Sequence, residues 1–369
     1  MAERMSLAST RIAQSRAAVA SLSTLERGGE GREDPMDPIS NTPTPYLGAT
    51  AAGFKRDAVQ KLFHQVGLRA IVGMVRYDDE DVRLHAVKVI ANLAADTHNQ
   101  GRIVEEEGLA ALLDIFRGKG SKSNGEATCR IAAGALANLA MREANQSDIL
   151  DSGAVELLTL FAHHAAEPQS HRMVAGAVAN LCGNNEVEVK LHAAGGLELL
   201  TALSESDSAE VLTQVGRGFA NYSRCGRGRR RMALDGALPR VVALATQDFP
   251  GVNSAARRHA QVALCEIAMD ANNVRAIAEQ PGAIDVLAHL AEHAAGGSSL
   301  RRAAGKAIGV VMQHVGGGGD GDSRKSEGGR SNRDGGSGGL SLDDSRQRSG
   351  TQPISGGGGG SSEARRDSG

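Results

Sequence analysis

The sequence is poor in aromatic residues: its 369 positions hold no Trp, 3 Tyr and 6 Phe. A core with few aromatic side chains and much Ala and Leu favours close-packed helices over β-sheets. No apolar run approaches the roughly 18 residues of a membrane-spanning helix, and the N-terminus lacks the apolar segment of a signal peptide. We therefore expect a helical protein in the cytoplasm, with the nucleus as the alternative.

Neither the net charge nor the cysteine spacing indicates a nucleic-acid, membrane or metal site. The formal net charge is -2, so no overall basic field attracts nucleic acid or an anionic membrane. The four cysteines show neither paired spacing nor a metal-ligand pattern, which predicts buried, reduced side chains. They are Cys129, Cys182, Cys225 and Cys265. We expect no bound metal and no nucleic-acid partner.

Catalytic motifs are absent as well. The chain has no GxxxxGK[ST] phosphate-binding loop, no HExxH, no GxSxG and no CxxC. Two Gly-rich basic segments, GKGSKSNG and GRGRRRM, follow no strand pattern that would place phosphate groups at a helix N-terminus. These absences predict a non-catalytic chain without a cofactor.

One repeated phrase dominates the sequence that is present. It reads RIAAGALANLA from Arg130 and RMVAGAVANLC from Arg172. Its Asn recurs at spacings of 46, 42 and 41 residues, at Asn92, Asn138, Asn180 and Asn221. Glu266 occupies the slot 45 residues further on. A period in the low forties built from helix-forming residues predicts an all-α, armadillo-type α-solenoid (or its HEAT-type counterpart), a right-handed superhelix of about five to six repeats.

The repeat pattern divides the chain into three parts. Residues 1–53 are predicted to be a flexible leader, and residues 54–315 the armadillo-repeat domain, beginning with a helix over 54–66. Residues 316–369 are rich in Gly and Ser and are predicted to be a disordered tail, because such a composition cannot bury enough apolar surface to fold.

Within the domain we predict two or three helices in each repeat. The segment RCGRGRRR is expected to be a basic loop before the fifth repeat. Asn99, Asn145 and Asn272 are expected to cap the first helices of their repeats. The long helices are expected at 81–95, 128–141, 169–182, 209–222, 254–269 and 300–315, the last of which lacks the phrase, as a terminal capping repeat would.

The recurring Asn is the strongest candidate for a binding residue. Asn is a mediocre residue inside a helix, so its return at one register needs a reason. Its carboxamide offers both a donor and an acceptor, so a row of them along the concave surface can bind the main chain of an extended peptide or a helix. Alternatively, each Asn bonds to the adjacent repeat and fixes the stacking. The two interpretations stand open and do not exclude each other.

The residues one turn before each Asn determine the charge of the expected groove. Lys88, Gly134, Gly176 and Arg217 stand on the same helix face as the row. We expect a groove floor that is open at the two Gly positions and basic at Lys88 and Arg217. Such a floor suits an acidic or helical partner better than a basic peptide.

A cluster of five arginines lies in the predicted basic loop. Its arginines can dock an acidic surface or a phosphorylated partner. A solvated connection between repeats is the alternative, and we favour it. The absence of interleaved aromatic residues argues against single-stranded nucleic acid. The cluster comprises Arg224, Arg227, Arg229, Arg230 and Arg231.

Longer stretches of the repeats resemble a known family. AVKVIANLAAD, RIAAGALANLAMREANQ, SHRMVAGAVANLCGNNEVEVKLHAAGGLELL and RRHAQVALCEIA look like the C-terminal armadillo-repeat domain of the plant-type armadillo-repeat kinesins. In that family the domain follows a motor and a coiled-coil stalk, binds partners and helps to place the protein on microtubules. The motor domain is absent from this chain, so the resemblance implies no ATP hydrolysis by these residues.

The resemblance and the residues together predict a non-catalytic, protein-binding scaffold. The first expectation is a kinesin-tail-like module that recruits partners to microtubules or to a microtubule-associated protein. A stand-alone adaptor of the catenin or vacuolar-anchor kind, unconnected to microtubules, is the alternative. An accessory subunit of an enzyme is a third possibility.

Overall fold

The computed structural model describes residues 67–118, 124–246, 252–294 and 298–316. Regular structure in these ranges is helical throughout, without strands. All of it belongs to one compact unit, Met1–Asp320. The predicted leader, the expected helix over 54–66 and the tail from residue 317 onward lie outside the described residues.

Long helices carry the repeated phrase in every repeat but the last, and their apolar residues recur at helical spacing. Each lies within two residues of its predicted bounds. They are α4 (Glu80–Ala94), α7 (Glu126–Leu139), α10 (Pro168–Leu181), α13 (Ala209–Tyr222), α16 (Ser254–Ala268) and α19 (Ser299–Gly316).

Shorter helices complete the repeats. The first helices of successive repeats are α5 (Thr97–Glu105), α8 (Glu143–Asp151), α11 (Glu188–Ala193), α14 (Gly226–Leu234) and the 3-10 turn η1 (Ala271–Asn273) with α17 (Val274–Glu279). The second helices are α3 (Leu68–Met74), α6 (Gly108–Phe116), α9 (Ala154–His164), α12 (Gly196–Leu203), α15 (Leu238–Ala245) and α18 (Ala283–His293).

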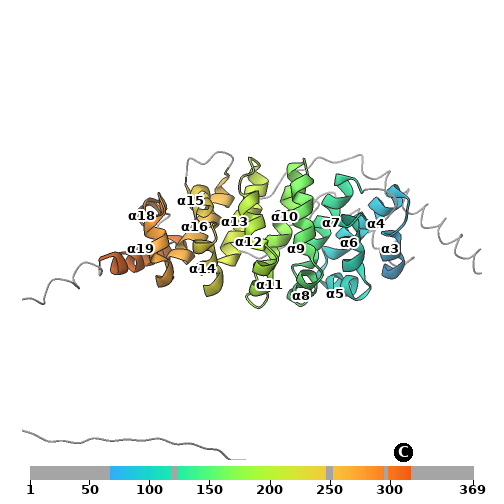
Figure 1. The fold of residues 1–369 in the computed structure, drawn as a ribbon, viewed down its shortest axis with the longest axis horizontal. Coiled ribbons are helices and arrows are strands. Elements are labelled where there is room, and N and C mark those ends of the chain that lie inside the picture. Colours follow the sequence, from blue (N-terminus) through green and yellow to red (C-terminus); the bar gives the residue numbers. More distant parts are fainter. Residues whose placement is uncertain (1–66, 119–123, 247–251, 295–297, 317–369) are drawn as a thin grey trace, which may run out of the picture. The chain divides into compact units, whose positions relative to one another are not determined.

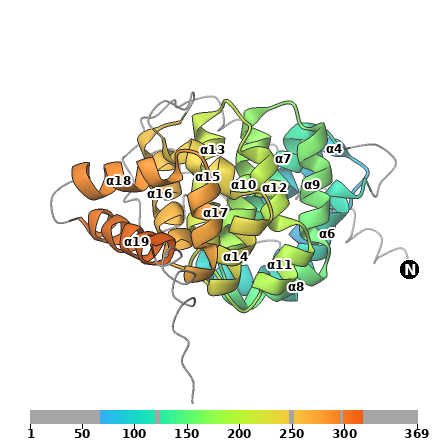
Figure 2. The same cartoon turned by 60° about the vertical axis from the view of Figure 1, so that its left-hand side comes forward.

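The long helices stack on one another in chain order. Helix α4 packs on α7, α7 on α10, α10 on α13, α13 on α16 and α16 on α19. The repeats follow one another from α3 to α19 (Figure 1), and α8, α11 and α14 succeed each other along one edge (Figure 2). Buried Ala residues such as Ala133 and Ala175 allow the helices to approach closely, and one apolar core continues through the stack. Each repeat therefore packs on its neighbours, as in a solenoid.

A recurring Gly marks the turn into the second helix of most repeats. Gly153, Gly236 and Gly282 have φ of 75°, 83° and 78°, in the left-handed region that favours Gly. In the fourth repeat the left-handed residue is Gly195, with φ of 82°. In the second repeat Glu107 adopts this conformation with φ of 61°, so the turn recurs in each of these repeats, with Gly as its usual residue.

The expected Asn caps are wrong. Asp96 caps α5 by accepting from the backbone N–H of His98, and Asp270 caps η1 in the same way. Asn145 lies buried inside α8, where its Nδ2 donates to the carbonyl of Leu139 at 3.2 Å and to that of Gln100 at 3.3 Å. It therefore satisfies one carbonyl group at the end of the preceding long helix and one in α5, instead of N–H groups at the start of its own helix.

The expected basic loop is also wrong, because Gly226–Leu234 forms helix α14. Arg is a good helix former, and the thiol of Cys225 accepts from the backbone N–H of Gly228 at 3.1 Å at the N-cap. A Cβ at Gly228 would collide with the carbonyl oxygen of Tyr222. Gly228 therefore serves close packing against the end of α13, not the flexibility of a loop.

The cysteines behave as packing residues. Cys129, Cys182 and Cys265 are buried, Cys225 is partly buried, and all four are free thiols. Burial raises the pKa of Cys129 to about 11 and that of Cys265 to about 12. In the described ranges no helix is both long and apolar enough to span a bilayer, and no three His, Cys, Asp or Glu side chains cluster as metal ligands would.

Candidate partner-binding site

The four Asn of the phrase occupy equivalent places on consecutive long helices, and we call them the Asn row. Asn138 and Asn221 are each 5% exposed, whereas Asn92 and Asn180 are partly exposed. Because the long helices stack in order, the row runs from α4 through α7 and α10 to α13.

Each Asn after the first bonds to the repeat before it. The Nδ2 of Asn138 donates to the carbonyl of Ala91 at 3.1 Å, and that of Asn180 to the carbonyl of Ala137 at 2.7 Å. The Nδ2 of Asn221 donates to the carbonyl of Ala179 at 2.9 Å. Every acceptor is the residue directly before the preceding Asn, so the row fastens successive repeats at one fixed register.

The side-chain oxygens of the Asn row make fewer hydrogen bonds within the described chain than its side-chain nitrogens do. Among the described residues, Asn138 and Asn221 accept no hydrogen bond through Oδ1, and neither oxygen belongs to the buried polar atoms that lack a partner. These two oxygens therefore keep some exposed surface and an unused acceptor capacity, although their residues are largely buried. The Oδ1 of Asn180 is engaged, because it accepts from Nη1 of Arg217 at 2.8 Å.

The side chain of Arg217 covers Gly176, one of the two Gly positions at which the groove floor was expected to be open. Its Nη2 donates to the carbonyl of Gly176 at 3.4 Å and to Oε1 of Gln214 at 2.8 Å, and its Nε donates to the same Oε1 at 3.1 Å. Gly134 and Gly176 are both buried. At Gly176 the expected open floor is therefore wrong, because the long side chain of Arg217 from the next repeat fills the room that the Gly leaves.

The two basic positions of the expected floor lie on different helices. Lys88 stands on α4 and is partly exposed, and Arg217 stands on α13. Burial lowers the pKa of the Arg217 guanidinium, which records the cost of removing its charge from water.

A second row of contacts joins the beginnings of the long helices. Arg130 pairs with Glu167 at 3.6 Å, and Arg172 with Glu210 at 3.8 Å, each across one repeat boundary. The equivalent contacts elsewhere use an amide: Arg83 donates to Asn124 at 2.9 Å, and Asn253 donates to the hydroxyl of Thr213 at 2.9 Å. In this second row the positive charges of Arg130 and Arg172 are neutralised by carboxylates.

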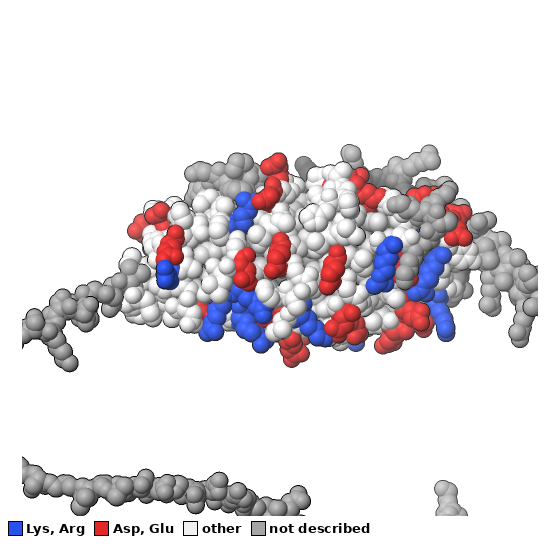
Figure 3. Space-filling view, in the orientation of Figure 1, with Lys and Arg blue, Asp and Glu red and all other residues white. Residues whose placement is uncertain are grey.

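Most of the arginine cluster is ion-paired inside the chain. Glu188, only 3% exposed, lies between Arg227 Nε at 3.2 Å and Arg231 Nε at 3.1 Å. The hydroxyl of Tyr222 donates to the same carboxylate at 3.0 Å, and burial beside it raises the pKa of Tyr222. Figure 3 shows Lys and Arg gathered around α14 with acidic residues close by.

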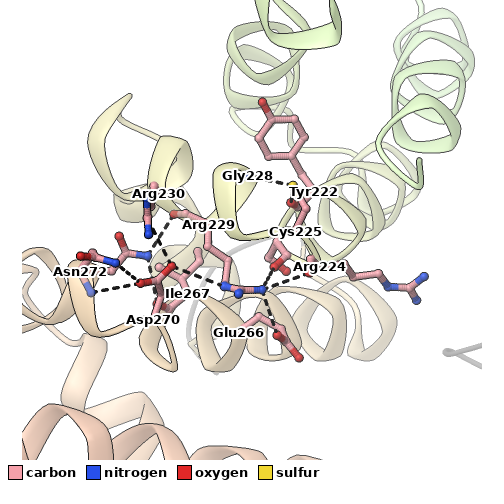
Figure 4. Close-up of polar contacts among 12 residues, drawn as sticks. Tyr222, Arg224, Cys225, Gly228, Arg229, Arg230, Glu266, Ile267, Asp270 and Asn272 are labelled. Atoms are coloured by element: carbon pink, nitrogen blue, oxygen red, sulfur yellow. Dashed lines mark hydrogen bonds and ion pairs between the residues drawn. The ribbon is translucent and has the colours of Figure 1, made fainter. Parts of the chain in front are cut away.

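The other members of the cluster bind the end of the fifth repeat (Figure 4). Arg229 lies 3.8 Å from Glu266 and 3.9 Å from Asp270, and Arg230 lies 3.7 Å from Asp270. Burial raises the pKa of Asp270, but hydrogen bonds from Asn272 and the two guanidinium groups outweigh it and lower that pKa.

Arg224 is the exception in the cluster. Its side chain extends away from the acidic residues and has no ion pair within the described part of the chain. Its four neighbours instead hold α14 to α11 and α16. This arrangement favours a structural role for the cluster over five free charges that await an acidic surface.

Several residues of these contacts were missed from sequence. Gln214 holds Arg217, Glu188 holds two arginines, and Glu126 accepts from the hydroxyl of Ser170 at 2.7 Å. Most of these contacts cross between repeats, with sequence separations close to the repeat period. A search for complementary polar residues one period apart would have found Glu188 and Glu126, but not Gln214, which lies on the same helix as Arg217.

The chain is similar in sequence to plant kinesin-like proteins. Over 232 residues, 60% of the chain, it is 37% identical to kinesin-like protein KIN-UA of Oryza sativa subsp. japonica, of which it covers 24%. Over 63 residues, 17% of the chain, it is 49% identical to kinesin-like protein KIN-UA of Arabidopsis thaliana, of which it covers 7%. The chain thus spans about a quarter or less of these relatives. No protein-family model matches it.

Solved structures support the fold. A designed armadillo repeat protein in complex with the peptide (KR)4 is 22% identical, with a TM-score of 0.58, over 66% of this chain and 99% of the designed one. The predicted armadillo-type fold and the resemblance to armadillo-repeat kinesins are confirmed. The chain is an all-α, armadillo-type solenoid that is similar over 60% of its length to a plant kinesin-like protein.

Proposed function

We propose that this solenoid is a protein-binding module whose Asn row binds the main chain of an extended partner segment. The observation that carries the proposal is the half-used carboxamide of Asn138 and Asn221. In each, Nδ2 donates to the preceding repeat, while Oδ1 accepts nothing from the described residues. An amide oxygen in this state can accept a backbone N–H of a partner.

The contacts between repeats support the proposal because they preorganise these acceptors. The bond to the preceding carbonyl holds each carboxamide in one orientation before a partner arrives. Less side-chain freedom is then lost on binding, which favours affinity. The fixing of repeats and the binding of a partner therefore use different atoms of one side chain.

We further propose that the module brings its partners to microtubules, in the cytoplasm and on the cytoskeleton. The support is the similarity to kinesin-like proteins over 60% of the chain. In this proposal the chain contributes partner recruitment and no catalysis. The alternative is an adaptor that is unconnected to microtubules, and the experiment below distinguishes the two.

Co-sedimentation of the purified chain with stabilised microtubules tests the microtubule proposal. We expect the chain to pellet with microtubules, or to pellet once a cytosolic extract supplies its partner, and to stay in solution without them. If the chain stays in the supernatant with and without extract, the microtubule proposal is wrong and an adaptor of another kind is indicated.

A further inference from the structure

Arg217 differs from Arg130 and Arg172 in having only neutral partners, a feature that it shares with Arg83 of α4. Its guanidinium donates to the amide oxygens of Asn180 and Gln214 and to the backbone carbonyl of Gly176. All three acceptors are neutral. Among the described residues no carboxylate pairs with it, so its positive charge is held in place but not neutralised.

The second row of contacts supplies the comparison. Arg130 and Arg172 stand on the preceding long helices, and each pairs with a carboxylate across a repeat boundary. The Glu210 of α13 is engaged by Arg172 and by Gln169, whose Nε2 donates to it at 2.6 Å. Glu210 is the single carboxylate within α13, the helix of Arg217, and its partners lie in the preceding repeat.

The position of Arg217 connects this charge to the Asn row. It bonds to Asn180, and Asn138 and Asn221 lie on the long helices directly before and after that residue. A partner segment that donates backbone N–H groups to the oxygens of both Asn138 and Asn221 would cross the position of Asn180. The guanidinium of Arg217 lies at that position. Arg217 is partly exposed, so part of its side chain is accessible from the surface.

We propose that Arg217 binds the carboxylate of an Asp or Glu side chain in the partner segment that lies along the Asn row. This inference rests on the proposed function and specifies the partner as an acidic peptide. One N–H of Nη1 is not used by the three neutral acceptors, and an incoming carboxylate can replace Asn180 or Gly176 at the others. A charged acceptor binds guanidinium more strongly than an amide oxygen does.

The test uses two labelled octapeptides, (DE)4 and (KR)4, in fluorescence anisotropy titrations of the full chain at low ionic strength. We expect (DE)4 to bind and (KR)4 not to bind. Arg217→Gln should weaken (DE)4 binding by about tenfold or more, since it removes a charge-assisted contact. The matched control is Arg130→Gln, which removes an arginine of the second row that is already paired with Glu167 and should change the affinity by less than about twofold.

A second variant protects the test against a loss of folding. Gln214→Glu keeps the shape of the side chain that holds Arg217 and supplies an internal carboxylate. It should weaken (DE)4 binding by about tenfold while preserving the thermal midpoint, because the guanidinium is then neutralised from within. Circular dichroism melts of all three variants establish that each is folded.

The inference is overturned if (DE)4 does not bind, if (KR)4 binds as tightly, or if Gln214→Glu leaves (DE)4 affinity unchanged. Failure here is distinguishable from failure of the proposed function. Peptides of any charge whose binding depends on Asn138 and Asn221 would preserve the main-chain proposal. Acidic peptides whose binding depends on Arg217 but does not change when Asn138 and Asn221 are replaced would overturn the main-chain proposal.

Discussion

At the scale of single residues, the carboxamide of Asn138 joins two repeats through one hydrogen bond. Removing it with Asn138→Ala leaves the carbonyl of Ala91 without that donor. We expect the free energy of unfolding to fall by about 1 kcal/mol, measured by urea denaturation.

Asn99 offers the matched control for this substitution. It is a partly exposed helical Asn whose side chain makes no hydrogen bond within the described ranges. Asn99→Ala should change the free energy of unfolding by less than about 0.5 kcal/mol. Equal losses at the two positions would mean that the Asn row contributes nothing to stacking.

Two helical glycines should respond to Ala in opposite directions. A Cβ at Gly228 would collide with the carbonyl of Tyr222, so Gly228→Ala should lower the free energy of unfolding by about 1–3 kcal/mol. At Gly176 the nearest atom to a Cβ is Oε1 of Gln214 at 3.7 Å, an ordinary contact. Gly176→Ala should raise stability by about 0.5–1 kcal/mol, because Ala is the better helix former. Thermal denaturation of both variants decides the matter, and destabilisation by Gly176→Ala would contradict the packing described.

At the scale of elements, the start of α10 is held by the preceding repeat. The Oε1 of Glu126 on α7 accepts from the hydroxyl of Ser170 at 2.7 Å and from the backbone N–H of Glu167 at 2.9 Å. The hydrogen bond from Ser170 and then that from Glu167 lower the pKa of Glu126 below 4.5. The carboxylate therefore acts as a helix cap supplied from another repeat.

This cap predicts a pH dependence of stability. Because the folded pKa of Glu126 is lowered, its contribution is complete above the unfolded pKa and is lost as the pH falls through the folded pKa. At pH 7, Glu126→Gln should lower the free energy of unfolding by about 1 kcal/mol, and the difference should vanish at acidic pH. Urea denaturation from pH 7 downward measures it, with the exposed Glu105→Gln as control. A constant difference across this range would exclude the charged cap.

The positions of the long helices could be predicted from the sequence, whereas helix α14 could not. The repeat period and the helical spacing of apolar residues located every long helix within two residues, because burial along a stack imposes both patterns. Helix α14 was missed because Gly226 and Gly228 resemble loop residues, although Gly228 is required by contact with Tyr222. That contact depends on how the chain turns between α13 and α14, which the two glycines alone do not indicate.

The candidate site was predictable in its positions but not in its bonds. Periodicity identified the Asn row and placed Arg217 one turn from it. The contact of Arg217 with Asn180, which covers Gly176, depends on how far one repeat is displaced against the next. That displacement cannot be predicted from the sequence of either repeat alone.

At the scale of the whole molecule, stability and binding depend on the same stacked repeats. Contacts between repeats fix the Asn row, and the row presents the oxygens of Asn138 and Asn221 to a partner. The similarity to kinesin-like proteins then assigns the partner to the cytoskeleton in our proposal. The solenoid serves as a rigid support on which only the partner segment must become ordered.

The most direct test of this account is the affinity of selected peptides for the chain with Asn138→Ala and Asn221→Ala combined. Peptides are first selected from a random library on the unchanged chain, and their Kd values are then measured on both proteins, with circular dichroism to establish folding. The account predicts Kd values raised by about tenfold or more in the folded variant. Unchanged Kd values together with a lowered free energy of unfolding would contradict it and leave the Asn row a purely structural feature.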